Sequence, residues 1–269
     1  MQRLLPLRKV KTIPLSLPTV IAMRLLLVNP NITTAVTDTM LAEARRSASA
    51  GTEIIAASAR FGVSYVENRA EAAIASHAVL ETLAARAGGC DAAIIAAFGD
   101  PALQAAKELM EIPVVGISEA AFLTAYMLGG RYAIVCLTQR LRVWYAESAR
   151  EQGLDRRLVS VRALEVAPAD IAKAKEEVGE RLVEQCVRAV EADGAEVIVL
   201  GGGPIAGLAR EIAHRLPVPI VDGVSCAVRM SEGLVQLKPR KATRGSFAKP
   251  PAKPAVGLTP DLLRLITHT

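Results

Sequence analysis

Short runs of aliphatic and β-branched residues alternate along the chain with longer amphipathic segments. A short apolar run is typical of a buried strand, whereas apolar positions that recur every three or four residues are typical of a helix. The runs predict strands at Arg24–Val28, Glu53–Ala56, Ala92–Ala97, Pro113–Ile117, Tyr132–Cys136, Val159–Leu164, Glu196–Leu200 and Val218–Val221. The amphipathic segments predict helices at Thr34–Ser47, Ser64–Ala85, Pro101–Met110, Ser118–Leu128, Arg140–Gln152, Asp170–Ala192, Ile205–Arg215 and Val224–Val235. This alternation predicts an α/β fold in which helices flank mostly parallel sheets.

An internal repeat divides this pattern into two similar parts. Residues 89–103 match residues 194–208 at an offset of 105, and each copy continues through a helix to a strand that begins near Pro113 or Pro219. Two such units predict two similar lobes that face each other across a ligand cleft. The alternative is that any two strand–helix–strand units look alike.

The ends of the repeated strands locate a candidate site. Ligands of open α/β sheets bind beyond the carboxyl ends of the strands. In the two copies these ends are Ala97-Phe98-Gly99 and Gly202-Gly203-Pro204, and both turns lead into predicted helices. Because the free amide groups at a helix start attract anions, the turns predict a site for a small anionic ligand. The alternative is a pair of tight turns without a binding role.

Composition and charge argue against several other classes of protein. Hydrophobic residues make up 51% of the 269-residue chain, which is enough for a sizeable core. The net charge of +5 comes from two segments without acidic residues, one before Met23 and one from Lys238 to Lys253. The rest of the chain is acidic, so nucleic-acid binding is not expected. The four cysteines form no CxxC pair and the three histidines show no ligand spacing, so we expect a reduced, cytoplasmic protein without a metal site.

The two ends of the chain differ from its body. Residues 1–22 are basic and contain three prolines, without a signal-peptide pattern, so a disordered leader is expected. Residues 238–257 form a basic, Pro-rich arm, and residues 258–269 predict a short helix with Pro260 at its first position. An apolar helix after a polar linker needs a surface that buries it, so we expect docking on a neighbouring subunit of a homo-oligomer; the alternative is a solvated arm. No membrane span is predicted.

Several collinear motifs between about residues 24 and 237 resemble those of hydantoin and allantoin racemases. Val28-Asn-Pro-Asn-Ile-Thr-Thr34 is similar to the NPNTT start of these enzymes, and Ile95-Ala-Ala-Phe-Gly-Asp-Pro-Ala-Leu103 is similar to their IACFDDPGL segment. Further similar segments are Val115–Ala121, Gly130–Val135, Asp193–Gly201 and Val221–Val224. The chain therefore resembles the aspartate/glutamate/hydantoin racemase family.

The resemblance implies both a domain arrangement and a mechanism. It implies two lobes related by a pseudo-twofold axis, residues 23–120 with 222–237 and residues 121–221. It also implies a cofactor-independent racemase in which one cysteine removes the α-proton and a second cysteine reprotonates the opposite face. The family's cysteine positions correspond to Ala97 and Gly202, which are 105 residues apart and therefore equivalent in the repeat. Both thiols are missing, and neither residue can act as an acid or a base.

Three ionisable residues are candidates to replace the missing thiols. Asp100 follows the first turn, Cys136 ends a predicted strand, and Asp222 lies at a strand end near the second turn. The structural alternatives are a helix-start acid for Asp100 and a packed small residue for Cys136. The substrate-binding positions that we expect are Asn29, Asn31, Ala97, Phe98, Gly99, Thr138, Gly202, Gly203 and Pro204.

Two classes of function remain open on the sequence alone. The first is a divergent racemase or isomerase that acts on a hydantoin or a small amino-acid-derived acid, with a lyase or decarboxylase on the same fold as a variant. The second is a protein that binds a small carboxylate or ureide without turnover. A cleft that lacks an ionisable side chain on each face of the two turns would favour the second.

Overall fold

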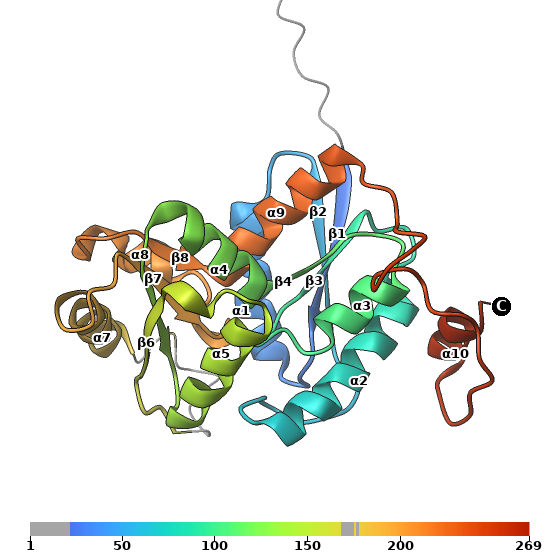
Figure 1. Cartoon of the computed structure of the whole chain (residues 1–269), viewed down its shortest axis with the longest axis horizontal. Coiled ribbons are helices and arrows are strands. Elements are labelled where there is room, and N and C mark those ends of the chain that lie inside the picture. The colour runs from blue at the N-terminus through green and yellow to red at the C-terminus, as the bar shows by residue number, and fades with distance from the viewer. Residues whose placement is uncertain (1–21, 168–174, 176–177, 269) are drawn as a thin grey trace, which may run out of the picture.

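Two parallel sheets organise the computed structural model, which describes residues 22–167, 175 and 178–268 (Figure 1). Within these residues each sheet has four strands, in the orders β2-β1-β3-β4 and β6-β5-β7-β8. The first sheet consists of β1 (Met23–Asn29), β2 (Thr52–Ser58), β3 (Ala92–Ile95) and β4 (Val114–Gly116). The second consists of β5 (Tyr132–Cys136), β6 (Leu158–Ala163), β7 (Val197–Gly201) and β8 (Ile220–Asp222). The two sheets have the same order and direction, so the predicted two-lobed α/β fold is confirmed.

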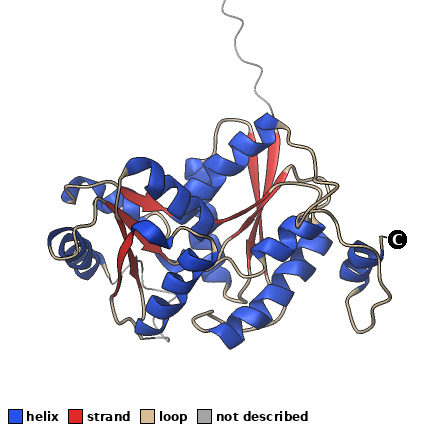
Figure 2. Cartoon of the chain, viewed as in Figure 1, coloured by secondary structure: helices blue, strands red, loops and turns tan. Residues whose placement is uncertain are grey.

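Helices cover both sheets (Figure 2). They are α1 (Thr34–Ser47), α2 (Arg69–Arg86), α3 (Leu103–Leu109), α4 (Ile117–Leu128), α5 (Gln139–Glu151), α7 (Gly179–Glu191), α8 (Leu208–Ile212), α9 (Gly223–Leu237) and α10 (Pro260–Thr267). Short 3₁₀ turns occupy Asp155–Arg157, Gly203–Ile205 and Ala213–Arg215. The Asp170–Ala192 prediction is observed as α7 in its second part, and residues 168–174 and 176–177 lie outside the described residues.

The pairing register relates the two sheets residue by residue. Val28 of β1 pairs with Ile95 of β3, and Val135 of β5 pairs with Leu200 of β7. Ile95 and Leu200 are 105 residues apart, which is the offset of the sequence repeat. Asn29 and Cys136, each one residue further along, are therefore equivalent positions at the carboxyl ends of the two central strands.

A large core runs through both sheets. Successive residues of a strand point to opposite faces, so Leu25 and Leu27 lie in the core shared by the two halves, whereas Leu26 and Val28 lie in a second cluster below α2 and α3. All four side chains are fully buried. The apolar runs of the sequence are thus strands buried on both faces, as parallel sheets require.

Helix α9 packs against the first sheet although it follows the last strand of the second. It contacts α1, α4 and β3. The carboxylate of Glu232 on α9 accepts hydrogen bonds from the Ser49 amide at 2.6 Å, in the turn before β2, and from the Thr52 hydroxyl at 2.7 Å, at the start of β2. The chain therefore returns to its amino-terminal half after completing the second sheet.

Three predicted helices begin or end elsewhere. Helix α2 starts at Arg69 and not at Ser64, because the Asn68 side chain caps it by accepting a hydrogen bond from the Glu71 amide at 3.0 Å. Helix α3 starts at Leu103 and not at Pro101, because Asp100 and Ala102 have positive φ angles of 48° and 64°. The predicted helix Ile205–Arg215 is interrupted at Gly207, whose φ is 89°.

The carboxyl-terminal helix covers part of its own chain. Helix α10 packs on α2, and Leu262 is buried there. In the arm before it, the Lys241 ammonium group donates to the Lys107 carbonyl oxygen. Within this chain α2 therefore supplies an apolar surface for α10, and docking of this helix on a neighbouring subunit stays a prediction. No helix among the described residues has the length and apolar character needed to cross a membrane.

Candidate small-molecule site

Each of the two predicted turns contacts a helix of the opposite half. The Phe98 ring lies 4.6 Å from the Tyr145 ring of α5, measured between centroids. On the other side, a Cβ atom built on Gly203 would lie 2.5 Å from the Met40 Sδ atom of α1. Met40 and Tyr145 are also 105 residues apart. The two turns are thus related by the repeat, and each packs against a helix of the opposite half.

The positions that correspond to the family's cysteines lie in these turns. Ala97 and Gly202 are both partly exposed. Gly202 has a φ of 135°, which L side chains rarely adopt, yet the nearest atom to a Cβ built on it is 3.8 Å away. Space for a side chain therefore exists at position 202, although the backbone there favours glycine.

The asparagines after β1 hold their turn together. The buried side-chain amide of Asn29 donates to Asn31 Oδ1 at 3.1 Å and to Thr37 Oγ1 at 2.8 Å. Its side-chain oxygen accepts from the Asn31 backbone amide at 3.2 Å. At the equivalent place after β5, the Thr138 hydroxyl donates to the Glu67 carboxylate at 3.2 Å. These side chains give both central strands a fixed, polar carboxyl end.

Asp100 joins the first turn to the start of the next helix. Its buried carboxylate accepts from the Ser118 amide at 3.0 Å and from the Glu119 amide at 2.7 Å, both in the first turn of α4. The side chain of Gln152, directly after α5, donates to it at 3.2 Å. Burial raises the pKa of Asp100 to about 6, although the hydrogen bonds from Ser118 and Glu119 act in the opposite direction.

Asp222 makes the corresponding link in the second half, but it lies on the strand and not beside the turn. It lies at the end of β8 and accepts from the amides of Val224 at 2.9 Å and Ser225 at 3.2 Å, which begin α9. It also accepts from the Gly207 amide at 2.7 Å. Burial raises the pKa of Asp222 as well. In the first half, Asp100 directly after the turn thus binds the start of α4, the helix after the next strand. In the second half, Asp222 at the end of β8 binds back to Gly207, which follows the turn.

Gly116 makes room for the Asp100 carboxylate, and its replacement tests this. A Cβ atom at position 116 would lie 2.2 Å from Asp100 Cγ, while the Gly116 φ of −88° is one that alanine adopts freely. We therefore expect Gly116→Ala to lower the free energy of unfolding by about 1–3 kcal/mol through overpacking. Urea denaturation followed by circular dichroism measures this loss.

Gly233→Ala is the matched control, because a Cβ at this position in α9 has no atom within 4 Å apart from its chain neighbours and the backbone of its own helix. We expect that variant to gain about 0.5–1 kcal/mol from helix propensity. Equal stabilities of the two alanine variants would contradict the packing assigned to Gly116.

Cys136 is a buried thiol at the end of β5. Its sulfur lies 3.3 Å from the Arg162 carbonyl oxygen and 3.6 Å from the Thr138 carbonyl oxygen, as a donor to both. Burial raises the pKa of the thiol to about 12, so it is protonated at neutral pH. Among the described residues no group of three or more His, Cys, Asp or Glu side chains could hold a metal ion.

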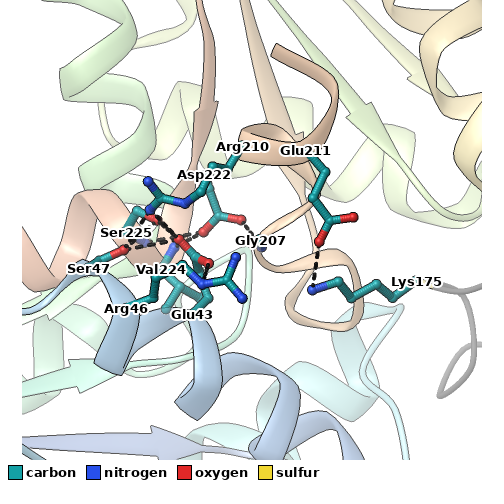
Figure 3. Close-up of polar contacts among 10 residues, drawn as sticks. All are labelled: Glu43, Arg46, Ser47, Lys175, Gly207, Arg210, Glu211, Asp222, Val224 and Ser225. Atoms are coloured by element: carbon teal, nitrogen blue, oxygen red, sulfur yellow. Dashed lines mark hydrogen bonds and ion pairs between the residues drawn. The ribbon is translucent and has the colours of Figure 1, made fainter. Parts of the chain in front are cut away.

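A buried acid on α1 connects α8 to α9 (Figure 3). The Glu43 carboxylate accepts from Ser225 at 2.7 Å, Arg210 at 2.8 Å and Ser47 at 3.0 Å. Burial alone would raise the pKa of Glu43, but these hydrogen bonds bring the pKa below its ordinary value. Figure 3 shows this carboxylate beside Asp222, with the Arg210 guanidinium group above both.

Sequence reasoning missed Glu43, Tyr65 and Tyr145. Glu43 lies on a predicted helix, where an acid is ordinarily solvated, and its partners are far away in the sequence. Tyr65 fell inside the helix predicted from Ser64, although Asn68 followed by Glu71 is a helix-start signal that would have excluded it. Tyr145 could have been found from the repeat, because it lies 105 residues after Met40 and is therefore its equivalent in the second half.

Comparisons with known proteins agree with this architecture. The model of the Asp/Glu/Hydantoin racemase family matches residues 25–231. A hydantoin racemase of Paenarthrobacter aurescens is 34% identical over 233 residues, which cover 86% of this chain and 99% of the relative. The allantoin racemase from Klebsiella pneumoniae is 38% identical, with a TM-score of 0.85 over 89% of this chain and 98% of that one. Arylmalonate decarboxylase, 18% identical with a TM-score of 0.57 over 91% of this chain and 100% of its own, shares the fold. The chain therefore belongs to the Asp/Glu/Hydantoin racemase family.

Proposed function

We propose that this protein is a cofactor-independent isomerase of the hydantoin racemase type, acting on a hydantoin-like or small amino-acid-derived acid between the two turns. The observation that carries the proposal is the pair of equivalent turns, Ala97–Gly99 and Gly202–Pro204, at the carboxyl ends of β3 and β7. Each is partly exposed and bounded by a helix of the opposite half. The family membership and the relatives named as hydantoin and allantoin racemases support the same reaction type.

The proposal requires an acid and a base other than the two thiols. Inversion by proton transfer needs one group on each face of the substrate. Asp100 is the first candidate base, since a pKa of about 6 leaves its carboxylate ionised at neutral pH and it directly follows the first turn. Cys136 and Asp222 are the further candidates, Cys136 as an acid because its thiol stays protonated.

The hydrogen bonds that these three groups already make within the protein favour a second function. The carboxylates of Asp100 and Asp222 already accept backbone hydrogen bonds, and the Cys136 thiol donates to backbone carbonyl groups. A site in which all three candidate acids and bases already bond to the backbone suits a protein that binds a small carboxylate or ureide without turnover. The two functions differ in whether the bound ligand exchanges its α-proton.

Proton exchange with solvent tests the proposal. The protein is incubated in D₂O with 5-substituted hydantoins, allantoin, aspartate and glutamate, while NMR follows the α-proton and polarimetry follows optical rotation. We expect loss of both signals with at least one compound, faster than without protein. Binding without exchange would replace the proposal with the second function, and neither binding nor exchange would overturn both.

A double variant, Ala97→Cys with Gly202→Cys, asks whether the turns are placed for two-base chemistry. We expect it to exchange the α-proton about 10²-fold faster or more than wild type, the usual size of an acid–base contribution. Ala97→Ser with Gly202→Ser is the matched control, because it imposes the same backbone strain at position 202 without a thiol. Equal rates for the cysteine and serine pairs would contradict the placement of the site.

A further inference from the structure

The hydroxyl group of Tyr65 is buried without a hydrogen-bond partner among the described residues. A buried hydroxyl that makes no hydrogen bond costs roughly 1–3 kcal/mol of stability. Two other tyrosines of the chain avoid this cost: the hydroxyls of Tyr126 and Tyr132 donate to the Leu154 carbonyl oxygen at 2.8 and 2.9 Å. The unpartnered hydroxyl of Tyr65 therefore needs its own explanation.

Tyr65 lies beside the candidate site. It belongs to the loop between β2 and α2, and the loop is tied to the turn after β1 by the Thr33 hydroxyl, which donates to the Ser64 carbonyl oxygen at 2.7 Å. Its hydroxyl is close enough to Tyr145 and Cys136 for each to affect its pKa. Cys136 ends the central strand of the second sheet, so the Tyr65 hydroxyl reaches from the first half toward the second.

Tyr145 connects this hydroxyl to both turns. Its ring packs against Phe98, the neighbour of Ala97, at 4.6 Å. Its Cε2 atom would lie 2.8 Å from a Cβ atom on Gly201, the neighbour of Gly202. Tyr145 is thus next to both turns, and Tyr65 is its neighbour on the side of the loop between β2 and α2.

The surroundings keep both phenols in their neutral form. Burial raises the pKa of Tyr65 and of Tyr145, and the ionisable groups that act on them, Cys136, Glu67, Glu71 and Asp100, raise it further. The neighbouring Tyr145 hydroxyl lowers the pKa of Tyr65 as a nearby hydrogen-bonding group, although the two hydroxyls do not meet the distance and angle of a hydrogen bond. A neutral phenol donates its proton in a hydrogen bond and does not serve as a base at neutral pH. The complementary group on a ligand is therefore an oxygen acceptor.

We propose that the Tyr65 hydroxyl donates a hydrogen bond to a carbonyl or carboxylate oxygen of the ligand held between Ala97 and Gly202, with Tyr145 as the ring that positions it. The acceptor class is a ureide or hydantoin carbonyl, or the carboxylate of an amino-acid-derived acid. The inference rests on the proposed site, and it adds a binding residue and a ligand group to it. It assigns the unpartnered hydroxyl to recognition of the ligand.

Tyr65→Phe separates recognition from structure, because it removes only the hydroxyl. Isothermal titration with 5-methylhydantoin, allantoin and N-carbamoyl amino acids measures affinity, and urea denaturation measures stability. We expect Tyr65→Phe to bind at least tenfold more weakly than wild type, while its urea midpoint stays unchanged or rises. Tyr126→Phe loses the hydrogen bond to the Leu154 carbonyl oxygen, far from the turns. It is expected to have a lower midpoint and unchanged affinity.

The other outcomes are distinguishable. Equal affinity of wild type and Tyr65→Phe for a compound that wild type binds would overturn this inference and leave the proposed function standing. A Tyr65→Phe midpoint that falls as far as that of Tyr126→Phe would also overturn it, because the hydroxyl would then have a partner within the protein. Wild type that binds none of the compounds would overturn the proposed function and this inference together.

Discussion

Replacing Glu43 with alanine is expected to lower the free energy of unfolding by about 1.5–3 kcal/mol, the usual contribution of hydrogen bonds to a charged group. The Glu43 side chain is 2% exposed and accepts hydrogen bonds from Ser47, Ser225 and Arg210. These donors come from α1, α9 and α8, so one substitution removes contacts among three helices. The hydroxyl groups of Ser47 and Ser225 would then lose their charged partner, whereas the Arg210 side chain is 52% exposed and stays solvated.

Urea denaturation of matched variants isolates this contribution. Glu43→Gln keeps the volume of the side chain and one oxygen acceptor, so its loss is expected to be smaller than that of Glu43→Ala. Glu211→Ala is the control: Glu211 pairs with Lys175 at 3.3 Å at the surface (Figure 3). An exposed pair of this kind contributes about 1 kcal/mol or less. Similar losses for Glu43→Ala and Glu211→Ala would contradict a stabilising role of Glu43 among the three helices.

The stability of wild type relative to Asp100→Asn is expected to fall by about 3 kcal/mol as the pH rises from 4 to 7. Burial raises the pKa of Asp100 from 3.8 to about 6 on folding, a difference of about two units at about 1.4 kcal/mol each. Between these values the folded state binds more protons than the unfolded state, so stability decreases with increasing pH. The contribution is fully present below pH 3.8 and is lost above about pH 6.

Unfolding free energies of both proteins across this range measure the effect. Asp222 has a pKa shifted in the same direction, and Glu43 and Glu232 have lowered pKa values whose contributions are lost only below their ordinary value of 4.5. All of these groups are present in both proteins and cancel in the difference. The exposed Asp38→Asn variant serves as a control for the loss of one acid. Parallel curves for wild type and Asp100→Asn would rule out a raised pKa at Asp100.

The strands were predictable because their environment is uniform. A strand such as β1 or β7 is buried on both faces, so its sequence is a continuous apolar run that needs no knowledge of its neighbours. The repeat offset likewise assigns Ala97 and Gly202 to equivalent turns, because it compares only residue types at a fixed spacing. Both inferences need nothing beyond the order of residues along the chain.

The roles of the ionisable residues depend on contacts between distant segments. Asp100 follows the first turn, as predicted, but the sequence does not show that its carboxylate reaches Ser118 through the space left by Gly116. Glu43 has a partner 182 residues away in Ser225. The unpartnered hydroxyl of Tyr65 was equally unpredictable, since the absence of a partner depends on every segment that surrounds it.

The return of α9 to the first half determines the order in which the chain can complete its fold during synthesis. The first sheet is complete once Gly116 has left the ribosome, but α9, which packs on α1 and supplies Ser225 and Glu232, follows the entire second sheet. Nascent chains ordinarily fold domain by domain from the amino terminus. Here the apolar face of α1 and the Glu43 carboxylate have no partner from α9 until residues 223–237 have been synthesised. The amino-terminal half therefore reaches its final structure last.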